Sequence, residues 1–306
     1  MTPAAEPVRI VEVGPRDGLQ NHTGLIVPTH VKIEFIRRLV AAGHTHIEAG
    51  AFVRPDRVPQ MADSEEVFEA LADLAGTGVR LAGLVPNMRG LQRTDDLDAI
   101  GEAAVFTAAT DAFNQRNIGT TIEGAFERFE PVFAAAKERH LPVRGYISVA
   151  FGTHDGERCD APFAARVCEI AQRLIDMGAY EVSVGDTVGV GTVADIERVL
   201  DALLPALGAD HVALHLHDTR GQALANILTG LRRGVRCFDA SAGGLGGCPF
   251  APRSTGNVAT EDVLYMLEGL GYATEVDLEL QMKASWYVES VIGRSLPSRA
   301  LAAAKR

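Results

Sequence analysis

Short apolar runs alternate with longer amphipathic stretches along most of the chain. Eight of these runs are rich in β-branched and small apolar residues, as expected for strands that are covered on both faces. The eight predicted strands are Val8–Val13, Thr45–Ala49, Val79–Val85, Ala103–Ala108, Val143–Ala150, Glu181–Val184, Val212–Leu216 and Val235–Ser241.

Between the apolar runs, hydrophobic residues recur at the spacing of an α-helix. In the stretch 31–42, for example, Val31, Phe35, Leu39 and Ala42 fall on one helical face. The other predicted helices are Ala62–Leu74, Thr121–Arg139, Pro162–Met177, Val193–Leu207 and Leu224–Arg233.

The repeated order of strand and helix favours an α/β fold, a (β/α)8 TIM barrel over about residues 8–271. A doubly wound open sheet would show the same alternation, although no GxGxxG sequence follows the first predicted strand. After the barrel, Leu278–Ile292 predicts one extra helix. Because the sequence shows no linker or repeat, we expect a single domain over residues 1–306, with residues 272–306 as a helical extension.

Composition excludes several classes of protein. The chain of 306 residues is 47% hydrophobic and 23% charged, which is ordinary for a globular protein. Its net charge of −11 argues against a nucleic-acid partner, because phosphate contact needs clustered lysine and arginine. No run of about 18 apolar residues predicts a membrane span. Four cysteines without a CxxC pair and no secretory signal favour a reducing compartment, and we expect a cytoplasmic protein.

Polar residues gather where the predicted strands end, and in a barrel these ends share the face that holds the active site. Five segments contribute: Val13-Gly14-Pro15-Arg16-Asp17-Gly18-Leu19-Gln20-Asn21, Glu48, Gly185-Asp186-Thr187, His215-Leu216-His217-Asp218-Thr219, and Gly243-Gly244-Leu245-Gly246-Gly247-Cys248-Pro249 followed by Asn257.

His215 and His217 give the strongest local indication of a metal site. Residues i and i+2 of a strand point to the same side, so the two imidazoles are expected together. Asp17 and Asn257 are predicted on the same face, and oxygen ligands with two imidazoles suit Mg²⁺, Mn²⁺ or Co²⁺. The alternative is one buried histidine bonded to backbone and one surface histidine.

Arg16 and Asp17 lie in a segment with glycine on both sides, which favours a tight turn at the barrel mouth. In the functional interpretation, Asp17 binds the metal and Arg16 stabilises a developing oxyanion. Glu48 could then hydrogen-bond to Arg16 and orient it. The alternative is a purely structural set of ion pairs.

Cys248 follows a run of glycines, and such a loop could bring a thiol to the substrate as a mobile acid or base. A small buried apolar side chain is the alternative for this cysteine. Asp186 is the preferred partner to orient an imidazole, and Gln20 and Asn226 are further candidates for supporting roles.

These motifs resemble those of hydroxymethylglutaryl-CoA lyase, a member of the DRE-TIM metallolyases, which are (β/α)8 barrels. The resemblance covers about Val8 to Gly271 and also includes Val58-Pro59-Gln60-Met61, Gly221-Gln222-Ala223-Leu224-Ala225-Asn226 and Gly256-Asn257-Val258-Ala259-Thr260-Glu261-Asp262. The Leu19 after Arg-Asp-Gly distinguishes the lyases from similar synthases, which usually carry Glu there.

The resemblance implies a retro-Claisen cleavage of 3-hydroxy-3-methylglutaryl-CoA to acetyl-CoA and acetoacetate, with Mg²⁺ or Mn²⁺ as cofactor and a homodimer as the assembly. It implies Asp17, His215, His217 and Asn257 as metal ligands and Arg16 as the group that stabilises the thioester enolate. Glu48 would support Arg16, and Cys248 would protonate the acetyl-CoA carbanion. Whether Asp17 or His215 takes the hydroxyl proton stays open.

The chain also departs from the family pattern. Ala51 stands where the family usually has a hydroxyl, and Val149 and Thr153 stand where it usually has cysteine. A lyase for citramalyl-CoA or for a longer 3-hydroxy-3-alkylglutaryl-CoA is therefore the alternative enzyme. An inactive barrel that serves as a binding module is the alternative from another class.

Overall fold

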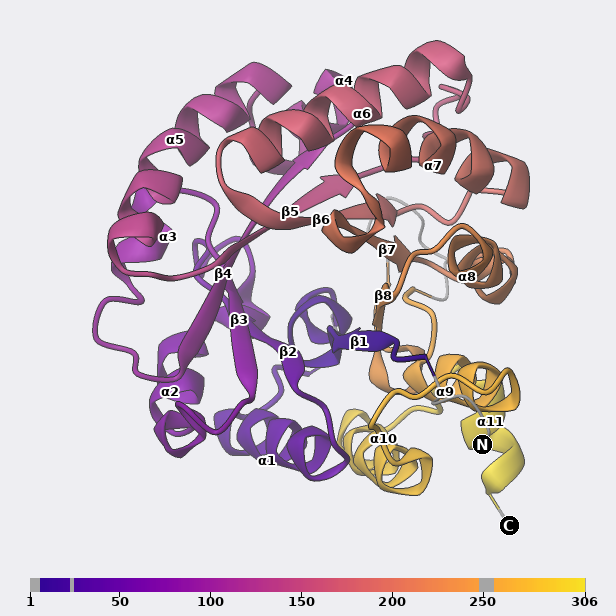
Figure 1. Cartoon of the computed structure of the whole chain (residues 1–306). Helices are drawn as coiled ribbons and strands as arrows, with labels where there is room; N and C mark the ends of the chain where they lie inside the picture. Colours follow the sequence, from indigo (N-terminus) through magenta and orange to yellow (C-terminus); the bar gives the residue numbers. More distant parts are fainter. Residues whose placement is uncertain (1–5, 23–24, 248–255, 306) are drawn as a thin grey trace.

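Eight parallel strands close into a barrel in a computed structural model that describes residues 6–22, 25–247 and 256–305 (Figure 1). Each strand pairs with the next, and β1 pairs with β8 from Arg9↔Cys237 to Glu12↔Ala240. The strands are β1 (Arg9–Glu12), β2 (His46–Ala51), β3 (Arg80–Leu84), β4 (Ile100–Ala108), β5 (Val143–Ser148), β6 (Ala179–Asp186), β7 (Val212–Leu216) and β8 (Cys237–Ala240). The predicted TIM barrel is confirmed, and the closing pair β1–β8 excludes the open sheet.

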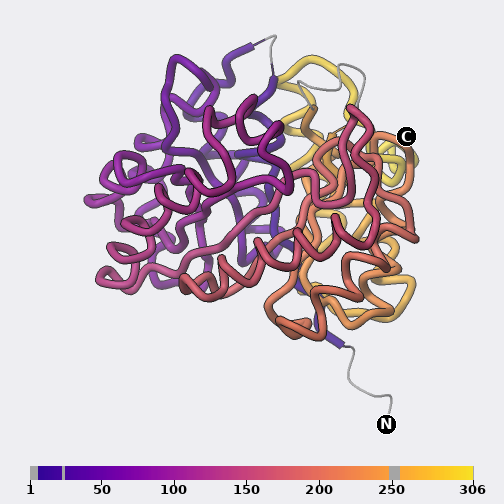
Figure 2. Tube along the Cα trace, turned by 90° about the horizontal axis from the view of Figure 1, so that it is seen from above, coloured from indigo at the N-terminus to yellow at the C-terminus, as the bar shows by residue number. Residues whose placement is uncertain are grey.

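Helices surround the barrel and cover the outer faces of its strands (Figure 1). They are α1 (Thr29–Ala41), α2 (Ser64–Glu69), α3 (Met88–Gln92), α4 (Asp111–Ile118), α5 (Ile122–Glu138), α6 (Ala161–Asp176), α7 (Val193–Leu207), α8 (Ala223–Arg232), α9 (Thr260–Gly269), α10 (Leu278–Ile292) and α11 (Arg299–Ala304). The α1 helix forms where the sequence pattern predicts it, because its buried Val31, Phe35 and Leu39 recur at helical spacing and face the barrel. Viewed from above, the first half of the chain forms one side of the molecule and the second half the other (Figure 2).

The prediction of one helix over 62–74 is wrong in its length. The helix α2 ends at Glu69, and a separate 3₁₀ turn covers Ala72–Leu74. Between them Leu71 leaves helical dihedral angles (φ −107°, ψ 14°) and is fully buried. Arg37 of α1 donates a hydrogen bond to the carbonyl oxygen of Ala70 at 3.0 Å, which takes up a backbone acceptor at this break.

The C-terminal helices pack against the start of the barrel. The predicted helix 278–292 is confirmed as α10, which lies beside α1 and α9 (Figure 1). On α10, Gln281 is buried and its Oε1 lies 2.8 Å from Nε2 of His44. Asp262 of α9 accepts hydrogen bonds from Ser298 and Ala300 and so holds the start of α11. Among the described residues, no helix is long and apolar enough to cross a membrane.

A layer of paired charges crosses the inside of the barrel. Arg144 of β5 reaches Asp239 of β8 at 2.7 Å and Glu181 of β6 at 2.7 Å, and all three side chains are buried. Because β5 and β8 are not neighbours in the sheet, the contact between Arg144 and Asp239 must run through the barrel interior. Arg9 of β1 also pairs with Glu181. This layer lies beneath the face on which the predicted site residues gather.

Candidate active site

The segment after β1 forms a single π-helical turn, Gly14–Gly18, which presents Arg16 and Asp17 at the barrel mouth. Glycine is required at position 18 by close packing, since an added Cβ would lie 2.7 Å from Oγ of Ser241 and 2.8 Å from Cβ of Leu245. At the start of the turn, the Gly14 N–H donates to Glu12 at 2.8 Å. The turn is therefore fixed against the segment that follows β8.

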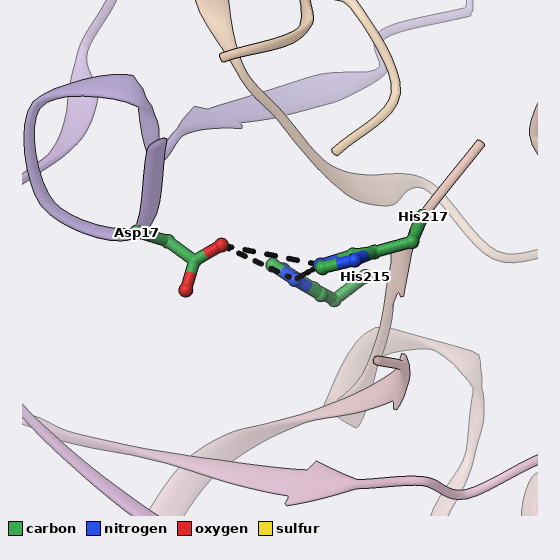
Figure 3. A group of neighbouring side chains, drawn as sticks. All are labelled: Asp17, His215 and His217. Atoms are coloured by element: carbon green, nitrogen blue, oxygen red, sulfur yellow. Dashed lines mark hydrogen bonds and ion pairs between the residues drawn. The ribbon is translucent and has the colours of Figure 1, made fainter. Parts of the chain in front are cut away.

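Asp17, His215 and His217 converge on one point (Figure 3). The Nε2 atoms of the two histidines lie 3.2 Å apart, and each lies 4.0 Å from Oδ2 of Asp17. One carboxylate oxygen and two imidazole nitrogens thus lie within 4.8 Å of one another. Both histidines are buried, so an ion held here would contact protein on several sides.

Asn257 and Gln20 extend this cluster through Asp17. Nδ2 of Asn257 donates to Asp17 Oδ2 at 2.7 Å, and Nε2 of Gln20 donates to Asp17 Oδ1 at 2.6 Å. The backbone of Asn257 also forms an isolated bridge with His217. A carboxylate, two imidazoles and an amide form a donor set that fits Mg²⁺ or Mn²⁺. The residues present are therefore compatible with the expected divalent ion.

Arg16 lies between two carboxylates. Its Nε donates to Glu48 Oε2 at 2.8 Å and its Nη1 to Asp17 Oδ1 at 2.8 Å. Burial raises the pKa of Glu48, and the charge of Arg16 only partly offsets that effect. Among the described residues, Glu48 Oε1 has no hydrogen-bond partner although it is buried. Arg16 is thus held in place, while Glu48 keeps one unused acceptor in the site.

The surroundings of Asp17 and His217 shift their pKa values in directions that favour metal binding. Burial opposes ionisation of Asp17, but Arg16 and the two histidines outweigh it and hold the pKa of Asp17 at about 2. Burial lowers the pKa of His217 to about 4, so its imidazole is neutral at pH 7. An ionised carboxylate and a neutral imidazole are the protonation states that bind a metal.

Asp186 does not orient an imidazole, and that prediction is wrong. Its carboxylate accepts the backbone N–H groups of Val190 and Gly191, each at 2.9 Å, because the loop after β6 folds back over it. Asp239 is the carboxylate that reaches a site histidine, with Oδ2 at 3.1 Å from Nδ1 of His215. The sequence contained one indication of this residue, an acidic side chain inside the predicted strand 235–241.

Two further predicted residues stand apart. Asn226 donates to the carbonyl oxygen of Gly191 at 2.9 Å and supports the loop after β6. Cys248 lies outside the residues that the structure describes.

A cavity of about 740 Å³ opens above the cluster. Its polar floor includes Arg16, Asp17, His215 and His217. Apolar side chains form part of its wall, and they include Phe52, Leu84, Phe106, Phe113 and Ile147.

Arginine is unusually frequent in the same wall, which also includes Arg54, Arg57, Arg89, Arg93 and Arg128. Arg54 pairs with Asp56 and Arg93 with Glu65. For Arg57 and Arg89, no carboxylate lies at ion-pair distance within the described parts of the chain. In a protein of net charge −11, this concentration of positive charge favours an anionic ligand.

The fold and the cluster together define a (β/α)8 barrel with a candidate metal centre at the carboxyl ends of its strands. The chain belongs to the HMGL-like family, whose model matches residues 7–288.

Known relatives agree with this family. The chain is 46% identical over 300 residues to the mitochondrial hydroxymethylglutaryl-CoA lyase of Arabidopsis thaliana, covering 98% of this chain and 62% of the relative. It is 46% identical over 294 residues to the 3-hydroxy-3-isohexenylglutaryl-CoA/hydroxy-methylglutaryl-CoA lyase of Pseudomonas aeruginosa, covering 96% and 95%. The crystal structure of hydroxymethylglutaryl-CoA lyase from Pseudomonas aeruginosa superimposes with a TM-score of 0.90 at 45% identity, covering 98% of both chains.

Proposed function

We propose that the protein is a carbon–carbon lyase that cleaves 3-hydroxy-3-methylglutaryl-CoA to acetyl-CoA and acetoacetate. The observation that carries the proposal is the convergence of Asp17, His215 and His217 beside Arg16 in a chain of the HMGL-like family. These products connect the reaction to leucine degradation and ketone-body formation.

The metal would be held by Asp17, His215 and His217. Asn257, whose NH₂ group donates to Asp17, would contribute its amide oxygen. When bound, Mg²⁺ or Mn²⁺ supplies Lewis-acid polarisation of the substrate oxygen atoms. Gln20 keeps Asp17 in position through Oδ1, and this leaves Oδ2 directed at the histidines.

Cleavage moves one proton and one electron pair. The proton of the C3 hydroxyl goes to a base, for which Asp17 and His215 are the candidates, and the C3 oxygen becomes the ketone of acetoacetate. The electrons of the broken C–C bond pass to the acetyl unit as a thioester enolate. The guanidinium of Arg16, fixed by Glu48, stabilises the enolate oxygen. Cys248 then protonates the enolate carbon, and transfer of the hydroxyl proton from the base to the Cys248 thiolate restores both groups and completes the reaction.

The arginines of the cavity wall support an acyl-CoA as substrate. A coenzyme A ester carries several phosphate charges, and guanidinium groups pair with phosphate through two parallel hydrogen bonds. Arg57 and Arg89 are the best candidates, because neither is engaged by a carboxylate among the described residues.

A longer 3-hydroxy-3-alkylglutaryl-CoA is the second candidate substrate. Phe52, Leu84, Phe106 and Phe113 give the cavity an apolar wall that could enclose more than a methyl group. The relative from Pseudomonas aeruginosa carries the isohexenyl substrate in its name.

We extend the proposal to a homodimer in the cytoplasm. Tyr265 and Leu270 on and after α9 and Leu280 on the adjacent α10 are exposed, and apolar side chains of this size favour a protein contact. Cys159, Cys168 and Cys237 are free thiols, as expected in a reducing compartment.

An assay with a small panel of acyl-CoA esters tests the proposal. Metal-stripped protein is supplied with Mg²⁺ or Mn²⁺, and release of acetyl-CoA is followed for the methyl ester, longer 3-alkyl esters and citramalyl-CoA. We expect cleavage that requires metal, together with thermal stabilisation by about 2.7 kcal/mol at a metal concentration of 100 Kd. Metal-induced stabilisation without cleavage of any ester would instead support an inactive binding module.

A further inference from the structure

The two histidines of the cluster have unequal support. Nδ1 of His215 lies 3.1 Å from Oδ2 of Asp239 in β8. Nδ1 of His217 is also buried, but within the described parts of the chain it has no hydrogen-bond partner. Among the described residues, a carboxylate therefore holds the Nδ1 side of His215, whereas the Nδ1 side of His217 has no such contact.

Asp239 is itself immobilised by groups from two other strands. Arg144 of β5 donates to both of its oxygens, at 2.7 Å to Oδ1 and 3.2 Å to Oδ2. Ser183 of β6 donates its hydroxyl to Oδ2 at 2.9 Å. All of these side chains are buried, so the position of the Asp239 carboxylate is set by the barrel interior.

This arrangement determines which nitrogen of His215 carries the proton. A carboxylate only accepts hydrogen bonds, so Nδ1 of His215 must be the donor. Its Nε2 faces Asp17 and His217 and is the nitrogen left to bind an ion. Only this tautomer can bind a metal through Nε2.

We propose that Asp239 is a positioning residue for His215: it fixes the tautomer and the orientation that the metal site needs. Arg144 and Ser183 act one step further back, by holding Asp239. The inference rests on the proposed metal centre. It adds a buried residue that does not line the cavity and that would otherwise be assigned only to the core. It implies that His215 is ready to bind metal before the ion arrives.

Asp239→Asn is the decisive variant. Arg144 donates to Oδ1 at 2.7 Å and Ser183 donates to Oδ2, the oxygen that faces His215, so the shorter Arg144 contact will hold the single amide oxygen of an asparagine at the Oδ1 position. Its NH₂ group is then left to face His215, which must accept through Nδ1 and carry its proton on Nε2. We expect Mn²⁺ to bind about 10–100-fold more weakly, as measured by electron paramagnetic resonance of free Mn²⁺.

Glu181→Gln is the matched control. Glu181 is the other buried carboxylate paired with Arg144, at 2.7 Å from its Nε, and among the described residues it bonds to neither site histidine. The substitution removes the same charge from the same arginine. We expect its Mn²⁺ affinity to stay within threefold of the wild type.

Nitrogen-15 NMR of labelled histidine gives a readout that a general loss of stability would not move. In the wild type we expect His215 to carry its proton on Nδ1, with assignment by comparison with His217→Ala. In Asp239→Asn the proton should move to Nε2. Should Asp239→Asn fail to fold, the wild-type spectrum still decides, and a neutral His215 with its proton on Nε2 and none on Nδ1 would overturn the inference.

The failure of the inference is distinct from the failure of the proposed function. A wild type that binds no Mn²⁺ and cleaves no acyl-CoA would remove the metal centre itself. A wild type that binds and cleaves, beside an Asp239→Asn protein with unchanged Mn²⁺ affinity and tautomer, would remove only the role of Asp239.

Discussion

The two ends of the barrel use the same kinds of residue for different purposes. At the amino-terminal end, Glu181 forms ion pairs with both Arg9 and Arg144. At the carboxyl end, Glu48 pairs with Arg16 through Oε2 but keeps Oε1 unpartnered within the described chain. Both carboxylates are buried. The difference between them is how completely each group is satisfied by the protein.

This contrast indicates how a charged side chain in a barrel can be assigned. Glu181, whose two oxygens both pair with arginine and which contacts neither site histidine among the described residues, contributes mainly to the fold, because removing a partner leaves an uncompensated charge. A carboxylate with an unused acceptor, beside a cavity and other ligand atoms, is available to an ion or a substrate. Four substitutions test the contrast.

Arg16→Gln should have the largest effect. Removing the guanidinium takes away the group proposed to stabilise the enolate, so we expect kcat to fall about 10³-fold, or ~4 kcal/mol. Acetyl-CoA release at saturating substrate measures it. Arg9→Gln makes the same change at the other end and should keep kcat within threefold. Near-normal turnover of the Arg16 variant would contradict the enolate role.

Glu181→Gln should mainly affect stability. It leaves Arg9 and Arg144 with less compensation inside the barrel, and we expect the free energy of unfolding to fall by about 3 kcal/mol. Denaturant melts monitored by circular dichroism measure it. If turnover fell as steeply as for Arg16→Gln while stability held, the division between the two ends would be wrong.

Arg57→Ala should raise KM for the acyl-CoA about tenfold and leave kcat unchanged, because the loss concerns a charge-assisted contact away from the reacting carbons. A thioester of the same acyl group that lacks the phosphates is the control substrate. Its KM should be equal for wild type and variant. An equal rise for both substrates would show that Arg57 does not contact phosphate.

Glu102→Gln should leave turnover unchanged and affect only stability, by an amount that depends on pH. Burial raises the pKa of Glu102 from 4.5 to about 7, although Arg144, Tyr180 and Arg80 oppose the rise. The folded state therefore holds this proton more tightly than the unfolded state, and wild-type stability falls as the pH rises from 4.5 through 7.

The glutamine variant cannot lose that proton. From pH 5 to pH 8 we expect its stability relative to the wild type to increase by about 2.5 kcal/mol, as measured by parallel melts. A relative stability that is flat or falls over this range would contradict the raised pKa.

The sequence predicted the eight strands because each is a compact apolar run, and it predicted Arg16, Asp17, His215 and His217 as neighbours because strand ends share one face. The helices α3, α4, α9 and α11 were missed, since each is short and weakly periodic. Local pattern gives little information about such helices, because packing decides whether they form.

Asp239 and Asp186 show where the local pattern fails. Asp186 follows a predicted strand and Asp239 lies inside one, and sequence position favoured Asp186 as the partner of an imidazole. The outcome depends on which residues of the neighbouring strands β7 and β8 stand side by side and on how the loop after β6 folds back. Neither is encoded within a few residues of the aspartate.

The charged layer inside the barrel has a consequence for protein engineering. His215 rests on Asp239, and Asp239 on Arg144, so support for the site descends through β7, β8 and β5. Transplanting only the mouth residues onto another barrel would leave an imidazole free to rotate. A successful graft would have to include Asp239 and Arg144 as well.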